Sequence, residues 1–118
     1  MRKIYYLGTC STCKRIIKEL ALNDEFLMRE IKSNPISNKE LEEMHKLSGS
    51  YESLFSRKAM KYRVMGLHEK QLQEADYMQL ILEEYTFLKR PVILIDGEIF
   101  IGNSKATVAA AKSKLANV

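Results

Sequence analysis

Both cysteines of the chain lie in one short segment, LGTCSTC from Leu7 to Cys13, with two small hydroxylated residues between them. A Cys-x-x-Cys pair of this kind can form a structural disulfide, ligate a metal ion or carry out thiol redox chemistry. A disulfide between residues three apart closes a very small loop, so it removes little entropy from the unfolded chain. A purely structural disulfide is therefore disfavoured.

The rest of the chain leaves three interpretations of the pair open. A structural zinc site needs four ligands, and neither His45 nor His68 stands at a zinc-site spacing from the cysteines. The two cysteines could also be small buried hydrophobic residues without chemistry. Redox chemistry is the interpretation that the surrounding residues favour, and it depends on the elements that position the two sulfurs.

The residues on either side of the pair predict a strand followed by a helix. Residues 3–7 (KIYYL) form an aromatic and β-branched run that stops at Gly8, which indicates a strand. After Cys13, apolar residues recur at the spacing of one helix face up to Ala21. The cysteine pair therefore lies where the predicted helix begins.

This placement has a chemical consequence for the two thiols. The first turn of a helix leaves backbone N–H groups unpaired and carries partial positive charge, so a thiolate there is stabilised and its pKa falls. We expect Cys10 to be that nucleophilic thiolate, with Lys14, Arg15 and the neighbouring Thr and Ser hydroxyls adding to its stabilisation. Cys13, one turn further on, is then the resolving thiol that attacks a mixed disulfide formed at Cys10.

The remaining segments predict an α/β domain with a helical insertion. Residues 26–31 predict a second strand, which completes a right-handed βαβ unit, and Ser37 and Glu40 have the spacing of a capping box that starts a helix ending at Gly49. Further along we expect a helical stretch at 51–65, as one helix or two short pieces, a helix at 71–88, strands at 92–95 and 98–101 joined through Asp-Gly, and a last helix after Ser104. The order is βαβ, a helical insertion at about 38–88, and ββα, in one domain spanning 1–118.

Composition and charge narrow the setting. The chain has 118 residues, of which 46% are hydrophobic, enough for one domain to bury a core without a disulfide or a metal. No apolar run reaches the roughly 20 residues that span a bilayer, and the N-terminus lacks a signal-peptide pattern, so we expect a cytoplasmic protein with reduced thiols and no membrane contact. The net charge of +4 is spread along the chain without a basic stripe, which disfavours direct nucleic-acid binding.

Short motifs occur along nearly the whole chain: CSTCK from Cys10, LFSR from Leu54 with Tyr62 and Gly66-Leu67 after it, KRPV from Lys89, and Gly102 after the last predicted strand. Together with the order of elements, from residue 4 to about residue 115, they resemble the thioredoxin-fold family that contains the ArsC arsenate reductases, the YffB-type proteins and the Spx transcriptional regulators. The resemblance implies a thioredoxin-like fold with a mixed four-stranded sheet.

The resemblance also implies roles for individual residues. Pro91 would follow a cis peptide bond and face the catalytic cysteine. Arg57 and Arg90 would bind an oxyanion substrate or its thiol adduct, a role that suits the fork of donors on a guanidinium group. The catalytic set is then Cys10, Cys13, Arg57, Arg90 and Pro91, with no bound cofactor or metal and with electrons from an external thiol such as glutathione or thioredoxin.

Two departures from the ArsC pattern shape the functional expectation. Gly102 stands where these reductases carry a third arginine, which puts arsenate reduction in doubt, and the second cysteine is shared with Spx rather than with ArsC enzymes of this type. We expect a thiol-disulfide oxidoreductase or thiol-dependent reductase that acts on a small-molecule or protein disulfide. The alternative is an Spx-like redox-switched regulator that binds the C-terminal domain of the RNA polymerase α subunit, where Gly49 lines up with an interface glycine.

Overall fold

The computed structural model describes residues 1–116 of the chain. These residues form two compact units. The first unit combines Met1–Asn34 with the chain from Arg90 onward, and the second is Pro35–Lys89. The second unit contains the whole of the predicted helical insertion.

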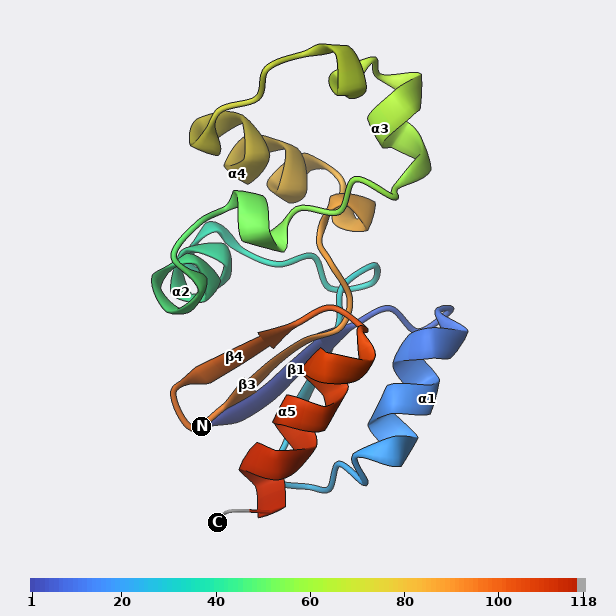
Figure 1. Cartoon of the computed structure of the whole chain (residues 1–118), viewed down its shortest axis with the longest axis vertical. Coiled ribbons are helices and arrows are strands. Elements are labelled where there is room, and N and C mark those ends of the chain that lie inside the picture. Colours follow the sequence, from blue (N-terminus) through green and yellow to red (C-terminus); the bar gives the residue numbers. More distant parts are fainter. Residues whose placement is uncertain (117–118) are drawn as a thin grey trace. The chain divides into compact units, whose positions relative to one another are not determined.

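The first unit is built on a four-stranded sheet (Figure 1). Its strands are β1 (Arg2–Tyr6), β2 (Leu27–Glu30), β3 (Val92–Ile95) and β4 (Glu98–Ile101), in the order β2-β1-β3-β4. β1 pairs with β2 in parallel and with β3 antiparallel, and β3 pairs with β4 antiparallel. The predicted mixed four-stranded α/β sheet is confirmed.

The turn between β3 and β4 forms as the Asp-Gly pair predicted. Asp96 has φ 47° and Gly97 has φ 91°, so both central residues are left-handed, as a tight two-residue hairpin requires. Asp96 also accepts hydrogen bonds from the N-terminal amine and from Arg2, each at 3.4 Å. The hairpin is thereby tied to the start of β1.

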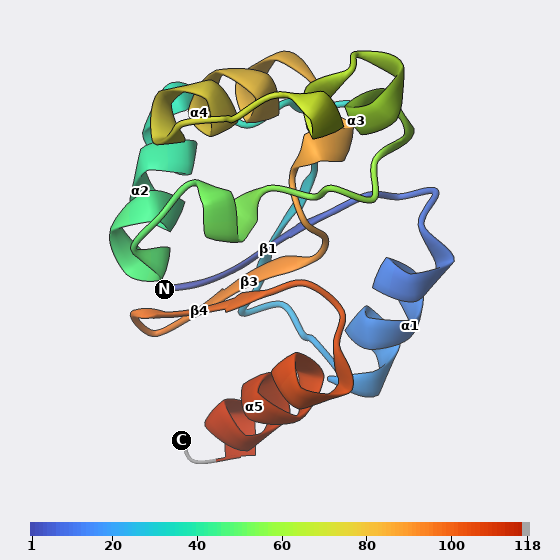
Figure 2. The ribbon, with the colours of Figure 1, turned by 45° about the horizontal axis from the view of Figure 1, so that its top comes forward.

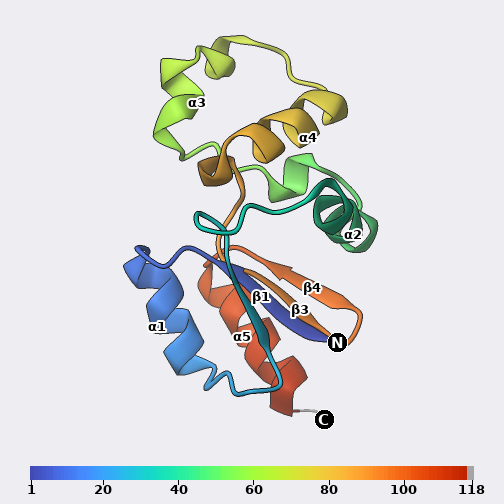
Figure 3. The same cartoon turned by 180° about the vertical axis from the view of Figure 1, so that it is seen from behind.

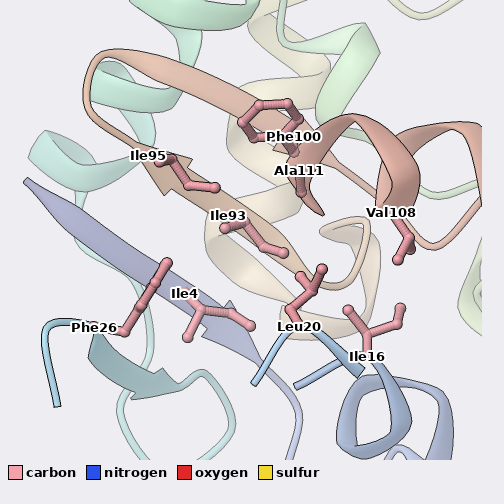
Figure 4. Packing of buried hydrophobic residues seen from close by; sticks show 9 residues of the cluster. All are labelled: Ile4, Ile16, Leu20, Phe26, Ile93, Ile95, Phe100, Val108 and Ala111. Atoms are coloured by element: carbon pink, nitrogen blue, oxygen red, sulfur yellow. The ribbon is translucent and has the colours of Figure 1, made fainter. Parts of the chain in front are cut away.

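Helices α1 (Ser11–Glu19) and α5 (Lys105–Ala116) cover one face of this sheet (Figures 2 and 3). The core between sheet and helices is entirely apolar (Figure 4), and its buried residues are Ile4, Ile16, Leu20, Phe26, Ile93, Ile95, Phe100, Val108 and Ala111. Burying one such large side chain contributes about 1.5–3 kcal/mol. Because Ile16 and Leu20 anchor α1 to the sheet, they also fix the start of α1, where the cysteine pair lies.

The second unit is helical and contains α2 (Asn38–Ser48), α3 (Met60–Val64) and α4 (Glu74–Glu83), with short 3-10 turns at Glu52–Leu54, Leu67–Glu69 and Tyr85–Phe87. Ser37 and Glu40 form the predicted capping box, with N–H to side-chain distances of 3.1 and 2.9 Å. Gly49 ends α2 in a left-handed conformation, with φ 88°. Inside the unit the buried ring of Phe55 stacks on Phe87, is tilted against Tyr77 and meets the half-buried Tyr62 edge-on.

The longer helical predictions are broken into pieces in this unit. The stretch at 51–65 consists of a 3-10 turn and α3, as the two-piece expectation allowed. The helix expected at 71–88 stops at Glu83, because Glu84 adopts an extended conformation and its carboxylate accepts hydrogen bonds from the N–H and hydroxyl of Thr86. Within residues 1–116, no helix is long and apolar enough to cross a membrane.

Candidate active site

The cysteine pair lies at the start of α1, as predicted. Cys10 is the residue that caps the helix, and its Sγ accepts a hydrogen bond from the Cys13 N–H at 3.4 Å. The Cys10 side chain is half-buried, whereas Cys13 is fully buried in the first turn. Both thiols are free. One sulfur is therefore open to solvent while the other is kept behind it.

The surroundings of the two sulfurs shift their acidities in opposite directions. Partial burial raises the pKa of Cys10, but hydrogen bonds from Cys13 and the Thr12 N–H, together with the charge of Arg90, outweigh it and hold the pKa below its ordinary value. Burial is the main cause that raises the pKa of Cys13 to about 11, and the neighbouring Cys10 raises it further. At neutral pH, ionisation therefore favours Cys10 while Cys13 keeps its proton.

The groups that favour the Cys10 thiolate differ from those expected from the sequence. The hydrogen bonds come from backbone N–H groups and the Cys13 thiol, where the sequence had suggested hydroxyl groups. The contributing cation is Arg90, which lies far away in the sequence, where Lys14 and Arg15 had been expected to act. The position of Arg90 next to β3 brings it to the end of the sheet where β1 leads into α1.

The Arg90–Pro91 segment has two further features. The peptide bond between the two residues is cis, as the resemblance implied, and the carbonyl of Pro91 accepts a hydrogen bond from Gly102 N at 2.9 Å. Nη1 of Arg90 is buried and has no hydrogen-bond partner within residues 1–116. A buried donor without a partner is costly, so an anion bound at Nη1 would recover a hydrogen bond without displacing another.

Arg57, the other predicted anion binder, lies in the second unit. Its Nη2 donates to the Glu52 carboxylate at 2.6 Å and to the Tyr77 hydroxyl at 2.9 Å. The hydrogen bond to Glu52 is the main cause that raises the pKa of Arg57. The structure thus brings Cys10, Cys13, Arg90 and Pro91 into one unit, and the role of Arg57 stays a prediction.

Gly102, at the position of the family's third arginine, has a left-handed backbone. Its φ is 90°, and a Cβ at this position would meet nothing within 4 Å. Space is therefore available, but any side chain here would strain the backbone.

Sequence reasoning missed Glu30, the last residue of β2. Its carboxylate accepts hydrogen bonds from Gly8 N at 2.7 Å, Lys32 N at 2.9 Å and Ser33 N at 2.7 Å. The bond to Gly8 is the main cause that lowers the pKa of Glu30. Because Glu30 and Gly8 are 22 residues apart, no local spacing could have indicated the contact.

Comparisons with known proteins agree with this architecture. The model of the ArsC family matches residues 5–111. No curated protein sequence matches the chain at a significant level. Among solved structures, a YffB protein superposes with a TM-score of 0.77 at 22% identity, covering 94% of this chain and 98% of its own.

Two more solved structures are similar. An ArsC family related protein from Bacteroides fragilis has a TM-score of 0.77 at 22% identity and covers 92% of this chain and 95% of its own. An arsenate reductase from Vibrio cholerae has a TM-score of 0.73 at 20% identity, with 92% and 95% covered. At these identities the structural matches establish the fold, and the thioredoxin-like prediction is confirmed.

Proposed function

Since this chain belongs to the ArsC family, we propose that it is a thiol-disulfide oxidoreductase or thiol-dependent reductase, with Cys10 as nucleophile and Cys13 as resolving thiol. The observation that carries the proposal is the opposite shift of the two pKa values within one helical turn. A thiolate is the attacking form of cysteine, so the half-buried Cys10 sulfur can attack a disulfide while the buried Cys13 sulfur stays protonated.

The reaction proceeds in two exchange steps. The Cys10 thiolate attacks a disulfide R–S–S–R′, forming a Cys10–S–S–R mixed disulfide and releasing R′S⁻. Cys13 then loses its proton to solvent or base and attacks Sγ of Cys10, which releases RS⁻ and leaves a Cys10–Cys13 disulfide. Two equivalents of an external thiol reduce this disulfide and are oxidised to their own disulfide.

The order of the steps follows from the coupling of the two thiols. Burial is the main cause that raises the pKa of Cys13, and the Cys10 thiolate raises it further through a hydrogen bond and through its negative charge. Once Cys10 is bound in a mixed disulfide, its negative charge is gone, so the pKa of Cys13 falls by this contribution while the effect of burial stays. The resolving thiol is thereby activated by the capture of the substrate.

The remaining predicted site residues assist this chemistry without a bound cofactor. Arg90 stabilises the thiolate, and its unpaired Nη1 offers a donor to an anionic substrate or adduct. The family pattern adds Pro91 as the residue that shapes the site and Arg57 as a second anion binder. The expected reductant is glutathione, thioredoxin or a similar thiol in the cytoplasm, and the substrate is a small-molecule or protein disulfide.

Arsenate is a less suitable substrate for this chain. Gly102 replaces the third arginine of the family pattern, and its left-handed φ of 90° disfavours a side chain at that point. With one guanidinium fewer, the negative charge of a bound oxyanion is less well balanced. We therefore expect arsenate reduction to be slow compared with disulfide reduction.

Two measurements test this proposal: the pH dependence of Cys10 alkylation, and the turnover of a disulfide by the protein and its cysteine variants. Alkylation of Cys10 by iodoacetamide, followed by mass spectrometry, should show a rate midpoint below the free-cysteine value of about 8.5, and a midpoint at or above it would overturn the proposal. With hydroxyethyl disulfide as substrate and glutathione as reductant, Cys10→Ser should abolish turnover. Cys13→Ser should accumulate a mixed disulfide at Cys10, detectable by its added mass.

A binding assay distinguishes the alternative function, an Spx-like regulator, from the enzyme proposal. The oxidised and reduced protein would be mixed with the isolated C-terminal domain of the RNA polymerase α subunit, and capture would be measured in each state. Gly49, which lines up with an interface glycine, is explained here as the left-handed end of α2. Redox-dependent capture without disulfide turnover would replace the enzyme proposal by the regulatory one.

A further inference from the structure

The turn between β1 and α1 contacts both thiols. Cys10 N donates to Leu7 O at 3.0 Å, which closes the turn immediately before the helix. The backbone of Leu7 also forms a hydrogen bond with the Cys13 thiol, which lowers the pKa of Cys13 against the effect of burial. The positions of both sulfurs relative to the helix start therefore depend on how firmly residues 7–10 are held.

Glu30 holds this turn from the neighbouring strand. Its Oε2 accepts the Gly8 N–H at 2.7 Å, while Oε1 accepts the N–H groups of Lys32 and Ser33 at 2.9 and 2.7 Å. One carboxylate oxygen thus binds the residues that follow β2, and the other binds the turn that follows β1. Three hydrogen bonds to backbone donors keep it ionised, because they hold its pKa below the usual range.

The close approach of Glu30 depends on the absence of a side chain at residue 8. A Cβ on Gly8 would lie 3.3 Å from Oε2 of Glu30 and 3.4 Å from its Cγ, which is tighter than ordinary contact. The glycine therefore allows the carboxylate to reach the backbone of the turn. The hydrogen bond between Gly8 and Glu30 therefore joins the turn at residues 7–10 to the end of β2.

We propose that Glu30 is a positioning residue of the redox site, whose carboxylate holds the turn at residues 7–10 so that Sγ of Cys10 stays at the start of α1. The inference rests on the proposed function for its relevance to catalysis. Glu30 acts through its hydrogen bond to Gly8 and through the turn that leads to Cys10.

A positioning role of Glu30 and a purely electrostatic role predict opposite shifts in the pKa of Cys10 when Glu30 is replaced. A negative charge near a thiol disfavours the thiolate, so loss of the Glu30 charge alone would lower the pKa of Cys10. Loss of the anchor loosens the turn and weakens the hydrogen bonds that Cys10 receives at the helix start, which raises its pKa. The direction of the shift in a Glu30 variant therefore identifies the mechanism.

The decisive variant is Glu30→Gln, in which one of the two acceptor oxygens becomes an amide that cannot accept. We expect the alkylation midpoint of Cys10 to rise and its rate at neutral pH to fall about threefold to tenfold, the effect of weakening a hydrogen bond to a helix cap. Glu19→Gln, on the exposed surface of α1, removes the same charge without contacting the turn, and should leave the midpoint unchanged. A lowered or unchanged midpoint in Glu30→Gln would overturn the proposal.

Glu30→Asp adds a second comparison, because aspartate keeps the charge but is one methylene too short to reach both segments. Positioning predicts that it resembles Glu30→Gln, whereas a charge effect predicts that it resembles the unaltered protein. A midpoint equal to that of the unaltered protein would therefore count against the proposal.

A measurement on the unaltered protein guards against variants that fail to fold. The Gly8 amide lies outside the strands, yet its bond to Glu30 should slow its hydrogen exchange well below that of Thr9, as followed by NMR. Equal exchange at both amides would contradict the anchor. A Cys10 midpoint at or above that of free cysteine in the unaltered protein would instead contradict the proposed function, so the two failures are distinguishable.

Discussion

Arg90 and Arg57 carry the same guanidinium group into two different surroundings, one in each unit. Nη1 of Arg90 is buried without a hydrogen-bond partner within residues 1–116, whereas Arg57, with 46% of its side chain exposed, already donates to Glu52 and Tyr77. An unpaired buried donor gains a hydrogen bond when an anion arrives, while a paired one must first give up its partner. The family pattern alone therefore does not determine how available each arginine is to an anion.

The two units also differ in their titrating groups, because both cysteines lie in the first unit. The pKa of Cys13 in the folded state is about 11, above the value of about 8.5 for an unfolded cysteine. The folded state therefore favours the protonated form, and this contribution to stability is fully present below pH 8.5 and is lost as the pH rises through 11.

We expect the reduced protein to lose about 1–3 kcal/mol of unfolding free energy between pH 8.5 and 11 from this one group. Urea denaturation at a series of pH values, with reductant present, measures the loss. Other groups also titrate in this range, so the matched comparison is Cys13→Ala, whose stability should fall less steeply. Parallel profiles for the two proteins would mean that Cys13 is not shifted in the way its burial implies.

Arg90→Gln tests the first half of the comparison directly. Removing the cation should raise the pKa of Cys10 and slow its alkylation at neutral pH about threefold to tenfold. The pH profile of alkylation measures the effect. Arg15→Gln is the control, because it removes an equal charge that is closer to Cys10 in the sequence. An equal shift in both variants would show that net charge matters rather than the location of Arg90.

Arg57→Gln tests the second half. Loss of the bonds to Glu52 and Tyr77 should lower the unfolding free energy by about 0.5–1 kcal/mol, as for a largely exposed ion pair with one further hydrogen bond. The alkylation midpoint of Cys10 should stay where it is. A shift of that midpoint comparable to the one in Arg90→Gln would remove the distinction between the two arginines.

The sequence was sufficient to predict the elements that local rules govern. The Asp96-Gly97 hairpin, the Ser37 capping box and the start of α1 at Cys10 each depend on residues within a few positions of one another. The break after Glu83 escaped prediction, because the apolar period continues through it and a carboxylate on Glu84 competes for the local backbone.

The site itself was predictable only in part for a similar reason. The Cys-x-x-Cys spacing predicts Cys10 and Cys13, and the resemblance to a family motif predicts Arg90 and Pro91. The identity of the groups that lower the pKa of Cys10 depends on chain segments that meet in three dimensions, as does the anchor from Glu30 to Gly8. Pairwise contacts between distant segments leave no periodic signal in a single sequence.

The smallest expected effect concerns Glu52, whose carboxylate accepts a hydrogen bond from Arg57. If Glu52 competes with anions for this guanidinium, Glu52→Gln should raise the affinity of Arg57 for inorganic sulfate about twofold to threefold, the scale of one exposed ion pair. Titration followed by NMR at the Arg57 side-chain N–H signals measures this affinity. Glu42→Gln, which removes an equal charge from α2, separates competition from a general change in net charge. Equal affinities in the two variants would show that the ion pair with Glu52 does not limit anion binding, and the contrast between the two arginines would then rest on burial and on the Arg57–Tyr77 hydrogen bond.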